Sequence, residues 1–466
     1  MGEEAEAEEG APPPEVPAEE PRGDEETAAR GSRQPRLLGE AAVAASFLVH
    51  VGGISFLAYC FAPLLLPICE TFGVGRGRAA WTGAFAAGTG PLGGVVAKSL
   101  QRVVQLAGKE ARITCTMALA AVACFVSFLA AAVAETLVVL YLTLGVGAGL
   151  SCGMLYFDTI GQPSQLFRSD RRGLATGIAT SGAGMGGFIW PFITVAMITQ
   201  HGWTVCFVAL GCTFLGLHLL ALACSMYTRR NMASLRRSGS LKDVQEIGLW
   251  NLFSSWDIQI VLWSRVCYQI AIMVAFVHLD AFAEDLGHGP GFGATLVALL
   301  GVGSTTGRVL GGLLSDRLGT FPVFLSMTSG TGVLFAVWPA CRSKMAMAVL
   351  SLLIGLTFGA YTSLSPLVCS EIWGDAVVSE VVSVVYLGDA PSRLTGGPIA
   401  GFVFDWSGSY VAAILGGAFL IFFSVALVGF VIHRRARRRA AAAKYAALEQ
   451  DGEQWAAPGA IELQAS

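Results

Sequence analysis

The stretch Thr395-Gly-Gly-Pro-Ile-Ala-Gly-Phe-Val-Phe-Asp-Trp-Ser-Gly-Ser-Tyr410 lies between two long apolar runs near the C-terminus of this 466-residue chain. Glycine lets a backbone bend and proline interrupts a helix, so the Gly-Gly-Pro turn predicts a bend inside a hydrophobic segment. Trp406 and Tyr410 follow, and these residue types gather where a membrane meets water. The stretch therefore predicts a membrane helix that bends and ends at an interface.

The composition of the whole chain is that of a membrane protein. Apolar residues make up 54% and charged residues only 14%, well below the roughly 25% charged residues of a soluble domain. A helix needs about 20 mostly apolar residues to cross a bilayer. We expect twelve such helices, which makes the chain an all-α membrane protein, at 41–68, 81–100, 112–133, 137–160, 173–199, 204–227, 258–282, 292–315, 320–340, 345–369, 378–403 and 409–433.

The distribution of lysine and arginine predicts the orientation of these helices, because cytosolic loops carry an excess of both. If both termini are cytosolic, the cytosolic segments after residue 40 hold 19 basic residues and the outer loops hold four. We therefore expect both ends to face the cytosol. The first 40 residues hold 12 of the 33 acids and no aliphatic run, which predicts a disordered tail.

The two halves of the chain repeat. Gly90-Pro-Leu-Gly-Gly-Val-Val-Ala-Lys98 resembles Gly307-Arg-Val-Leu-Gly-Gly-Leu-Leu-Ser-Asp316 at an offset of 218 residues. Parallel repeats of this kind form two bundles with a substrate site midway through the membrane between them. The expected organisation is an acidic cytosolic tail at 1–40, six-helix bundles at 41–227 and 258–433, a cytosolic linker at 228–257 and a second cytosolic tail at 434–466.

Glycine is concentrated in the fifth and eighth expected helices. Gly182-Ala-Gly-Met-Gly-Gly and Gly301-Val-Gly-Ser-Thr-Thr-Gly307 are the clearest clusters. Because glycine has no side chain, it lets helices approach closely. Static packing explains most glycines of such a chain, but for these two helices we predict a close and moving interface.

Several motifs resemble those of monocarboxylate transporters in the major facilitator superfamily. Gly311-Gly-Leu-Leu-Ser-Asp-Arg-Leu-Gly319 is similar to the cytosolic loop motif of major facilitators, and Arg171-Arg-Gly-Leu-Ala-Thr-Gly-Ile-Ala179 resembles the loop and fifth helix of monocarboxylate transporters. The run from Pro398 to Tyr410 resembles their eleventh helix. The resemblance covers about 41–433. It implies the major facilitator fold, alternating access and, as in the best-known members, proton-coupled transport of lactate or pyruvate.

The chain departs from this family pattern at two positions. Proton-coupled lactate carriers of the family pair an acid with an arginine one turn later in helix 8, and carry a lysine in helix 1. Here Arg308 matches the arginine, but Ser304 stands in place of the acid and Cys60 where the lysine is expected. The resemblance therefore leaves the coupling ion and the substrate open.

Arg308 is the main candidate for substrate binding. An ionisable residue inside a membrane is a functional candidate by default. Arg308 precedes Asp316 by eight residues, which places it about 12 Å from the cytosolic end of its helix at 1.5 Å per residue. A guanidinium there can bind a carboxylate through two hydrogen bonds. We prefer this interpretation to a structural ion pair.

Asp389 and Arg393 lie four residues apart in the eleventh expected helix and so share a face. As a mutual salt bridge they neutralise two buried charges, and as an acid and arginine pair they would couple proton and anion. We expect the salt bridge, because adjacent opposite charges are buried most easily together. If Arg308 and Arg393 both faced the cavity with Asp389 protonated, the site would suit a dicarboxylate.

Further polar residues are candidates for proton transfer and gating. Asp158 and His50 could carry protons, since a buried carboxylate takes up a proton more readily and an imidazole titrates near neutrality. A core role is preferred for His50, and both roles stand equal for Asp158. Asp316 should latch the cytosolic gate by capping the start of helix 11. Arg317 should engage Asp375 or Glu380.

Other residues complete the set of expectations. Arg265 should reach the cytosolic surface by extending along its helix. The aromatic candidates for lining a cavity are ranked low, because aromatic residues of membrane helices more often pack against neighbours. These candidates are Tyr59, Tyr268, Phe358 and Tyr361.

No phosphate loop, metal cluster or paired nucleophile and base indicates an enzyme, a cofactor or a nucleic-acid partner. The 11 cysteines show no ligand spacing and are interpreted as core residues. We predict a secondary transporter of small organic anions, chiefly monocarboxylates, in the plasma membrane. Its expected partners are the anion, protons and membrane lipids, and an accessory membrane subunit is compatible with this organisation. The alternatives are a dicarboxylate or aromatic-acid carrier or exchanger, and a transport-inactive sensor or scaffold.

Overall fold

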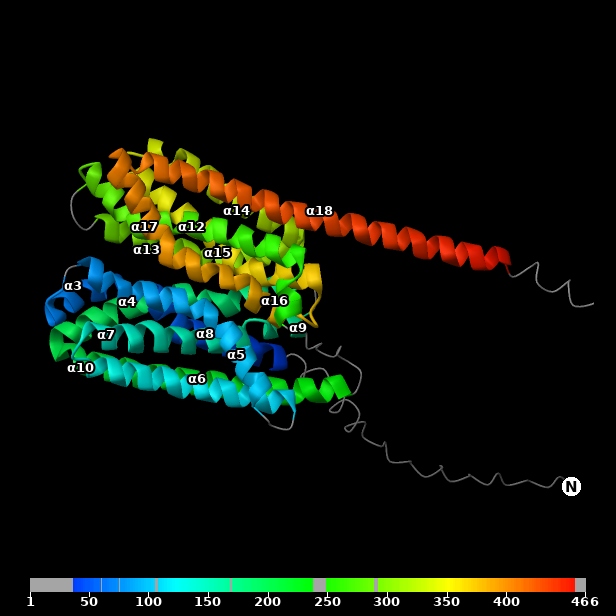
Figure 1. The fold of residues 1–466 in the computed structure, drawn as a ribbon, viewed down its shortest axis with the longest axis horizontal. Coiled ribbons are helices and arrows are strands. Elements are labelled where there is room, and N and C mark those ends of the chain that lie inside the picture. The colour runs from blue at the N-terminus through cyan, green and yellow to red at the C-terminus, as the bar shows by residue number, and fades with distance from the viewer. Residues whose placement is uncertain are drawn as a thin grey trace, which may run out of the picture.

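The computed structural model describes residues 37–59, 61–74, 76–104, 108–167, 170–237, 249–288 and 292–456. Within these ranges the chain forms helices and no strand, which confirms the all-α prediction. Figure 1 shows two helical bundles side by side, the N-terminal half in blue to green and the C-terminal half in green to red. The expected acidic tail lies mostly outside the described residues.

The N-terminal bundle begins with a helix at 37–49. It continues with η1 (His50–Ile54), α2 (Ser55–Tyr59), α3 (Phe61–Phe72), α4 (Arg76–Thr89), η2 (Gly90–Leu92), α5 (Gly93–Val103), α6 (Lys109–Ala132), α7 (Leu137–Leu140), η3 (Tyr141–Ala148), α8 (Gly149–Thr159), α9 (Gln162–Leu166) and α10 (Arg172–Arg237). Helix α10 contains two expected spans, which are separated by a kink at Gly202, where φ is 80°. Glycine adopts this backbone conformation without strain.

The C-terminal bundle follows the part of the linker that the structure does not describe. It consists of α11 (Leu249–Phe253), α12 (Trp256–Asp285), α13 (Phe292–Leu318), α14 (Thr320–Val337), η4 (Trp338–Ala340), α15 (Lys344–Trp373), α16 (Val378–Val385), η5 (Tyr386–Gly388), α17 (Asp389–Ser407) and α18 (Val411–Ala456). The expected end of the eleventh span is present, since α17 stops at Gly408 in a left-handed conformation with φ of 68°. Helix α18 projects well beyond the bundle (Figure 1).

Nine helices of the described ranges are long and apolar enough to cross a membrane. Three of the twelve expected spans do not form helices that are long and apolar enough, namely 81–100, 173–199 and 378–403. Each is glycine-rich, interrupted or charged. The eleventh span, for example, is divided into α16, η5 and α17 and carries Asp389 and Arg393. These three segments contact the opposite bundle, so they face protein more than lipid.

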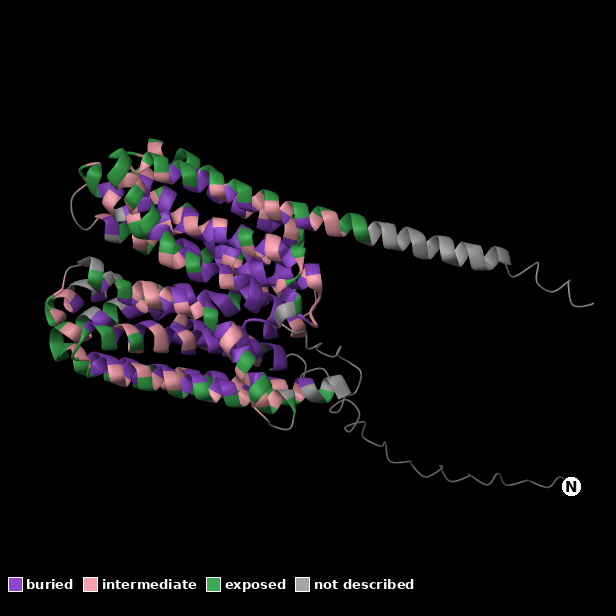
Figure 2. Cartoon of the chain, viewed as in Figure 1, coloured by how far each residue is buried: buried purple, intermediate pink, exposed green. Residues whose placement is uncertain are grey.

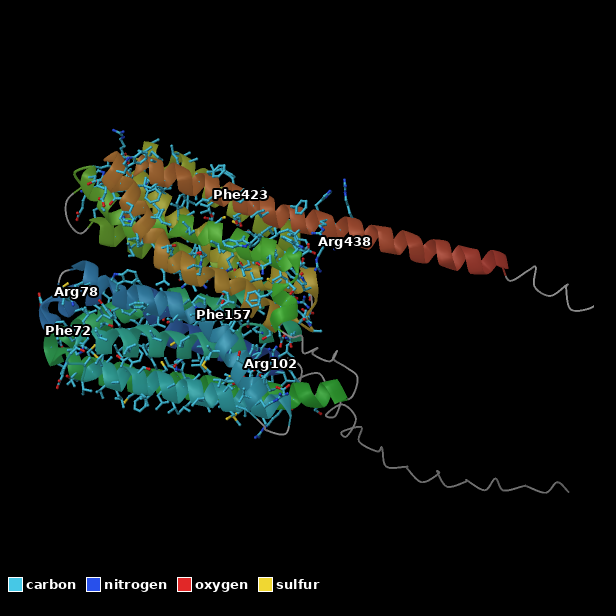
Figure 3. The ribbon with its side chains drawn as sticks, in the orientation of Figure 1. Phe72, Arg78, Arg102, Phe157, Phe423 and Arg438 are labelled. Atoms are coloured by element: carbon cyan, nitrogen blue, oxygen red, sulfur yellow. The ribbon has the colours of Figure 1, made fainter. Side chains whose placement is uncertain are left out.

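The exposed and buried surfaces fit a membrane protein. Large apolar side chains point outward, and Phe419 of α18 is 69% exposed, as expected for a surface in contact with lipid tails. Figure 2 shows buried residues gathered where the two bundles meet. Phe157 of α8 lies in this region (Figure 3), with its ring centroid 5.7 Å from that of Tyr386.

Helices α10 and α13 hold the bundles together through close backbone contact. A Cβ atom on Gly177 would collide with the carbonyl oxygen of Arg308, and one on Gly184 would collide with the side chain of Thr305. Only glycine allows such an approach. The close interface predicted from the glycine clusters is therefore present, and it brings Arg308 next to the other bundle.

Candidate functional site

Arg308 of α13 lies at the contact between the two bundles and is only 6% exposed. Its Nη1 donates a hydrogen bond to the carbonyl oxygen of Thr180 on α10 at 3.2 Å, and its Nε donates to Ser304 Oγ at 3.4 Å. Nη2 makes no hydrogen bond to any residue that the structure describes, and no carboxylate among them lies within ion-pair distance. The guanidinium has five N–H donors, so donors remain for an incoming anion.

Two side chains of the N-terminal bundle, His50 and Tyr156, lie within electrostatic range of Arg308. Their ring centroids are 5.1 Å apart in an edge-to-face arrangement. His50 is 1% exposed, and its Nδ1 lies 2.7 Å from the carbonyl oxygen of Ser46, to which it donates. This hydrogen bond within its own helix fits the core role preferred for His50.

Asp389 lies in a cluster of three charges. Nε and Nη2 of Arg265 donate to its two carboxylate oxygens at 2.5 and 2.9 Å, and Nη2 of Arg393 lies 3.5 Å from Oδ2. The salt bridge expected between Asp389 and Arg393 is present, but Arg265 is the closer partner. This two-pronged contact makes Asp389 the counter-charge of two arginines inside the bundle.

The expectation that Arg265 reaches the cytosolic surface is wrong. The residue is 4% exposed, and its Cζ lies 3.4 Å from the ring centroid of Tyr386. Asp389 and the aromatic ring compensate the charge inside the bundle, so the side chain has no need to extend to water.

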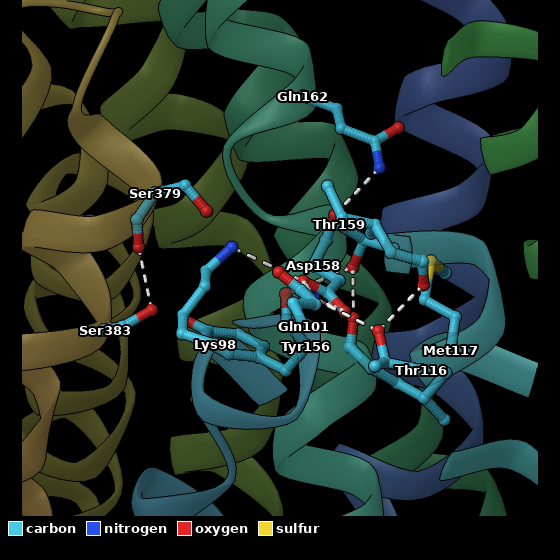
Figure 4. Close-up of polar contacts among 12 residues, drawn as sticks. Lys98, Gln101, Thr116, Met117, Tyr156, Asp158, Thr159, Gln162, Ser379 and Ser383 are labelled. Atoms are coloured by element: carbon cyan, nitrogen blue, oxygen red, sulfur yellow. Dashed lines mark hydrogen bonds and ion pairs between the residues drawn. The ribbon is translucent and has the colours of Figure 1, made fainter. Parts of the chain in front are cut away.

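Asp158 is fixed by neighbours of its own bundle. Gln101 Nε2 donates to both carboxylate oxygens at 2.9 and 3.0 Å, and Lys98 Nζ lies 3.5 Å from Oδ1. Figure 4 shows Lys98 and Gln101 directed at the carboxylate. These contacts hold both carboxylate oxygens within one bundle, so this geometry supports a structural role for Asp158 over proton transfer.

A small cavity of about 40 Å³ lies beside Asp158, where the N-terminal bundle meets the start of α16. Lys98 and Arg229 line one side, and Ser379 and Glu380 of α16 line the other. We call this side of the molecule the terminal end, because the first described helix starts there and α18 leaves there (Figure 1).

Asp316 joins the bundles at the terminal end. Its carboxylate oxygens accept hydrogen bonds from the backbone N–H groups of Gly173 and Leu174 at 2.6 and 2.8 Å. The sequence predicted that Asp316 caps the start of helix 11. It caps the start of α10 instead, because α13 packs along α10. A carboxylate at a helix N-terminus satisfies orphan donors and complements the helix dipole.

Arg172, at the start of α10, makes a second connection between the bundles. Its Nη2 donates to Asp375 Oδ2 at 2.8 Å, and Ser370 also bonds to Asp375. The expected partnership of Asp375 with Arg317 is therefore wrong. Arg317 is exposed, and in the described part of the chain it has no acidic partner.

The aromatic candidates pack within the C-terminal bundle. Tyr268 is fully buried, and its ring stacks on that of Tyr361 with centroids 3.7 Å apart. Phe358 meets Phe276 edge-to-face at 5.1 Å. These contacts fit the packing role that we considered more common. The side chain of Tyr59 and the whole of Cys60 lie outside what the structure describes.

Two tyrosines at the bundle contact were missed from the sequence. Tyr156 of α8 and Tyr386 of η5 lie with ring centroids 6.1 Å apart, one from each bundle. The available signal was their position, since Tyr156 comes two residues before Asp158 and Tyr386 three before Asp389. A polar aromatic residue close to a charge in an apolar helix would have indicated both.

Comparisons with known proteins agree with this architecture. A family model described as Major Facilitator Superfamily matches residues 159–388. Monocarboxylate transporter 12 of Mus musculus is 28% identical over 380 residues, which cover 75% of each chain. Monocarboxylate transporter 13 of Rattus norvegicus is 26% identical over 296 residues, which cover 63% of this chain and 67% of that one.

Solved structures share the fold. The E. coli fucose:proton symporter superposes with a TM-score of 0.59 at 15% sequence identity, over 84% of this chain and 98% of its own. Together, the paired bundles and these matches define a membrane transporter of the major facilitator class and not an enzyme. Within that class, the chain is similar to monocarboxylate transporters.

Proposed function

We propose that this transporter carries small organic anions, chiefly monocarboxylates similar to lactate or pyruvate, and binds them at Arg308. The observation that carries the proposal is a cation buried between the bundles without a carboxylate among the described residues. An uncompensated buried charge is strongly unfavourable, and a substrate carboxylate would compensate it through paired hydrogen bonds. The names of the monocarboxylate transporter relatives support the same substrate class.

Transport would proceed by rocking of the two bundles. The contacts of Asp316 and Arg172 hold them together at the terminal end, whereas their ribbons diverge at the opposite end (Figure 1). Because these polar contacts close the terminal end, we propose loading from the side away from the termini. The excess of basic residues in the loops of the terminal end supports a cytosolic position for both termini, and we propose the plasma membrane as the location.

A dicarboxylate is the second candidate substrate. Arg393 supports it, because its side chain keeps 28% exposure and its Nε has no hydrogen-bond partner among the described residues. Such a residue could meet a second carboxylate. The tight pairing of Asp389 with Arg265 and Arg393 already uses part of this charge, so we place the monocarboxylate first.

Uptake into liposomes tests the proposal. The purified protein is reconstituted and supplied in turn with labelled lactate, pyruvate, oxalate and an aromatic acid. We expect saturable, protein-dependent uptake with lactate or pyruvate preferred. A preference for oxalate would show that the substrate is a dicarboxylate and not a monocarboxylate. If none of the four compounds enters the liposomes with protein faster than it enters protein-free liposomes, anion transport is rejected in favour of a sensor or scaffold.

A further inference from the structure

The charge of the empty site has a consequence for the way in which transport is driven. Arg308 donates only to uncharged oxygens, those of Ser304 and Thr180. Within the described residues its guanidinium has no acidic partner, so the empty site carries a full positive charge. This step rests on the proposed function, in which Arg308 binds the substrate anion.

Two buried acids, Asp389 and Asp158, could act as a counter-ion to Arg308, but both are paired with other residues. Asp389 is held by Arg265 and Arg393. Asp158 is held by Lys98 and Gln101 in the other bundle. These contacts leave neither carboxylate as a mobile partner that neutralises Arg308 between transport cycles.

The titratable groups of the N-terminal bundle within electrostatic range of Arg308 cannot supply negative charge. His50 is neutral or positive, so a proton on its ring would add charge beside Arg308. The hydroxyl of Tyr156 is neutral at physiological pH. The helices that touch Arg308 from the remaining sides, α10 and α15, contribute the carbonyl of Thr180 and the hydroxyl of Ser363, which donates to the Arg308 carbonyl. Proton uptake at these positions therefore does not neutralise Arg308, and it does not help the transporter to return without substrate.

Rocking must pass through a state in which both ends are closed to water. An uncompensated cation at mid-membrane disfavours that state, whereas a bound monoanion neutralises it. We propose that this protein is an anion exchanger, in which the bundles rock readily only while Arg308 holds a carboxylate. One monoanion enters as another leaves, so the exchange moves no net charge and needs no proton.

Counterflow measurements test this proposal. Full-length protein is reconstituted in vesicles that contain either unlabelled lactate or sucrose, and labelled lactate is added outside. We expect initial uptake at least about tenfold faster into the lactate-loaded vesicles, since 1.4 kcal/mol of barrier corresponds to that factor. Equal protein-dependent rates would overturn the exchange mechanism and leave the proposed substrate intact. Absence of uptake in both would reject the substrate itself, and exchange with it.

A charge substitution at Ser304 tests the cause. Ser304→Asp places a carboxylate against Arg308 Nε, where Ser304 Oγ now lies at 3.4 Å, and should bring the ratio of loaded to empty rates close to one. Ser304→Ala removes the same hydroxyl without adding charge and should keep the wild-type ratio. Equal ratios in both variants would show that the charge is not responsible.

A proton gradient gives a test on the wild-type protein that does not depend on the folding of Ser304→Asp. We expect an inward proton gradient to leave protein-dependent uptake into sucrose-loaded vesicles unchanged. A rise to the rate of lactate-loaded vesicles would establish proton coupling and overturn the exchanger.

Discussion

Arg265 and Asp389 show how charge is managed inside the C-terminal bundle. Both are almost completely buried, and the guanidinium contacts both carboxylate oxygens while it lies against the Tyr386 ring. Such a pair adds little net stability relative to an apolar pair, but removal of one partner leaves an unpaired buried charge. The pair is therefore best understood as a fixed part of the bundle beside the site.

Truncation of one partner should be far more damaging than replacement of both. Asp389→Ala is expected to destabilise the protein by about 3–5 kcal/mol, since Arg265 loses its counter-charge. The double variant Arg265→Leu with Asp389→Leu should regain most of that loss. Thermal unfolding in detergent, followed by tryptophan fluorescence, measures both. An unfolding temperature of Asp389→Ala equal to that of the wild type would contradict this account of the pair.

The residues of the site were predicted unevenly from the sequence. Arg308 could be found because a charge in an apolar helix stands out, and its depth follows from helical rise. The partner of Asp389 could not, because Arg265 lies 124 residues away and no periodicity links two helices that meet only in the fold. The nearest arginine along the chain, Arg393, does pair with Asp389 as predicted, but the closer partner, Arg265, was missed for that reason.

At the scale of elements, α13 and α10 form the connection on which the two bundles meet. Glycines allow the backbones to touch along these helices, and Asp316 at the end of α13 caps the first turn of α10. The cap joins one bundle to the other through hydrogen bonds that must break when the terminal end opens. It therefore favours the closed state of that end.

Removal of this cap should shift the balance of states. Loss of a helix cap costs about 1 kcal/mol, which corresponds to about a fivefold change in the ratio of open to closed terminal ends. Asp316→Ala should show this change as a longer distance between spin labels on Arg171 and Arg317, which are exposed on opposite bundles. Matching distance distributions for Asp316→Ala and the protein with Asp316 intact would remove the latch from the mechanism.

The elements themselves were largely predictable, but their ends were less so. Apolar length located the spans, and Gly202 and Gly408 mark turns where a glycine conformation is needed. Polar composition suggested that the chain leaves its helices near 228 and 434, yet α10 runs to Arg237 and α18 to Ala456. Arginine and alanine are strong helix formers, so these helices continue past the apolar segments.

At the scale of the whole molecule, two bundles of similar order meet around Arg308, a buried cation whose guanidinium has no acidic partner among the described residues. The halves differ at the terminal end, where Asp316 caps a helix of the opposite bundle and Lys98, at the equivalent repeat position, pairs with Asp158 inside its own. The bundles are thus joined by specific polar contacts at one end and by glycine packing near the site. This organisation suits rocking about Arg308, which makes that residue the centre of the account.

The most direct test is lactate uptake by the Arg308→Gln variant in liposomes, with Arg342→Gln as the control because Arg342 is exposed in the loop between η4 and α15. Charge-assisted hydrogen bonds contribute about 1.5–3 kcal/mol, so uptake at low substrate should fall about 10- to 150-fold in Arg308→Gln and stay at the wild-type rate in Arg342→Gln. Wild-type uptake by Arg308→Gln would contradict the central claim that substrate binds at this buried cation.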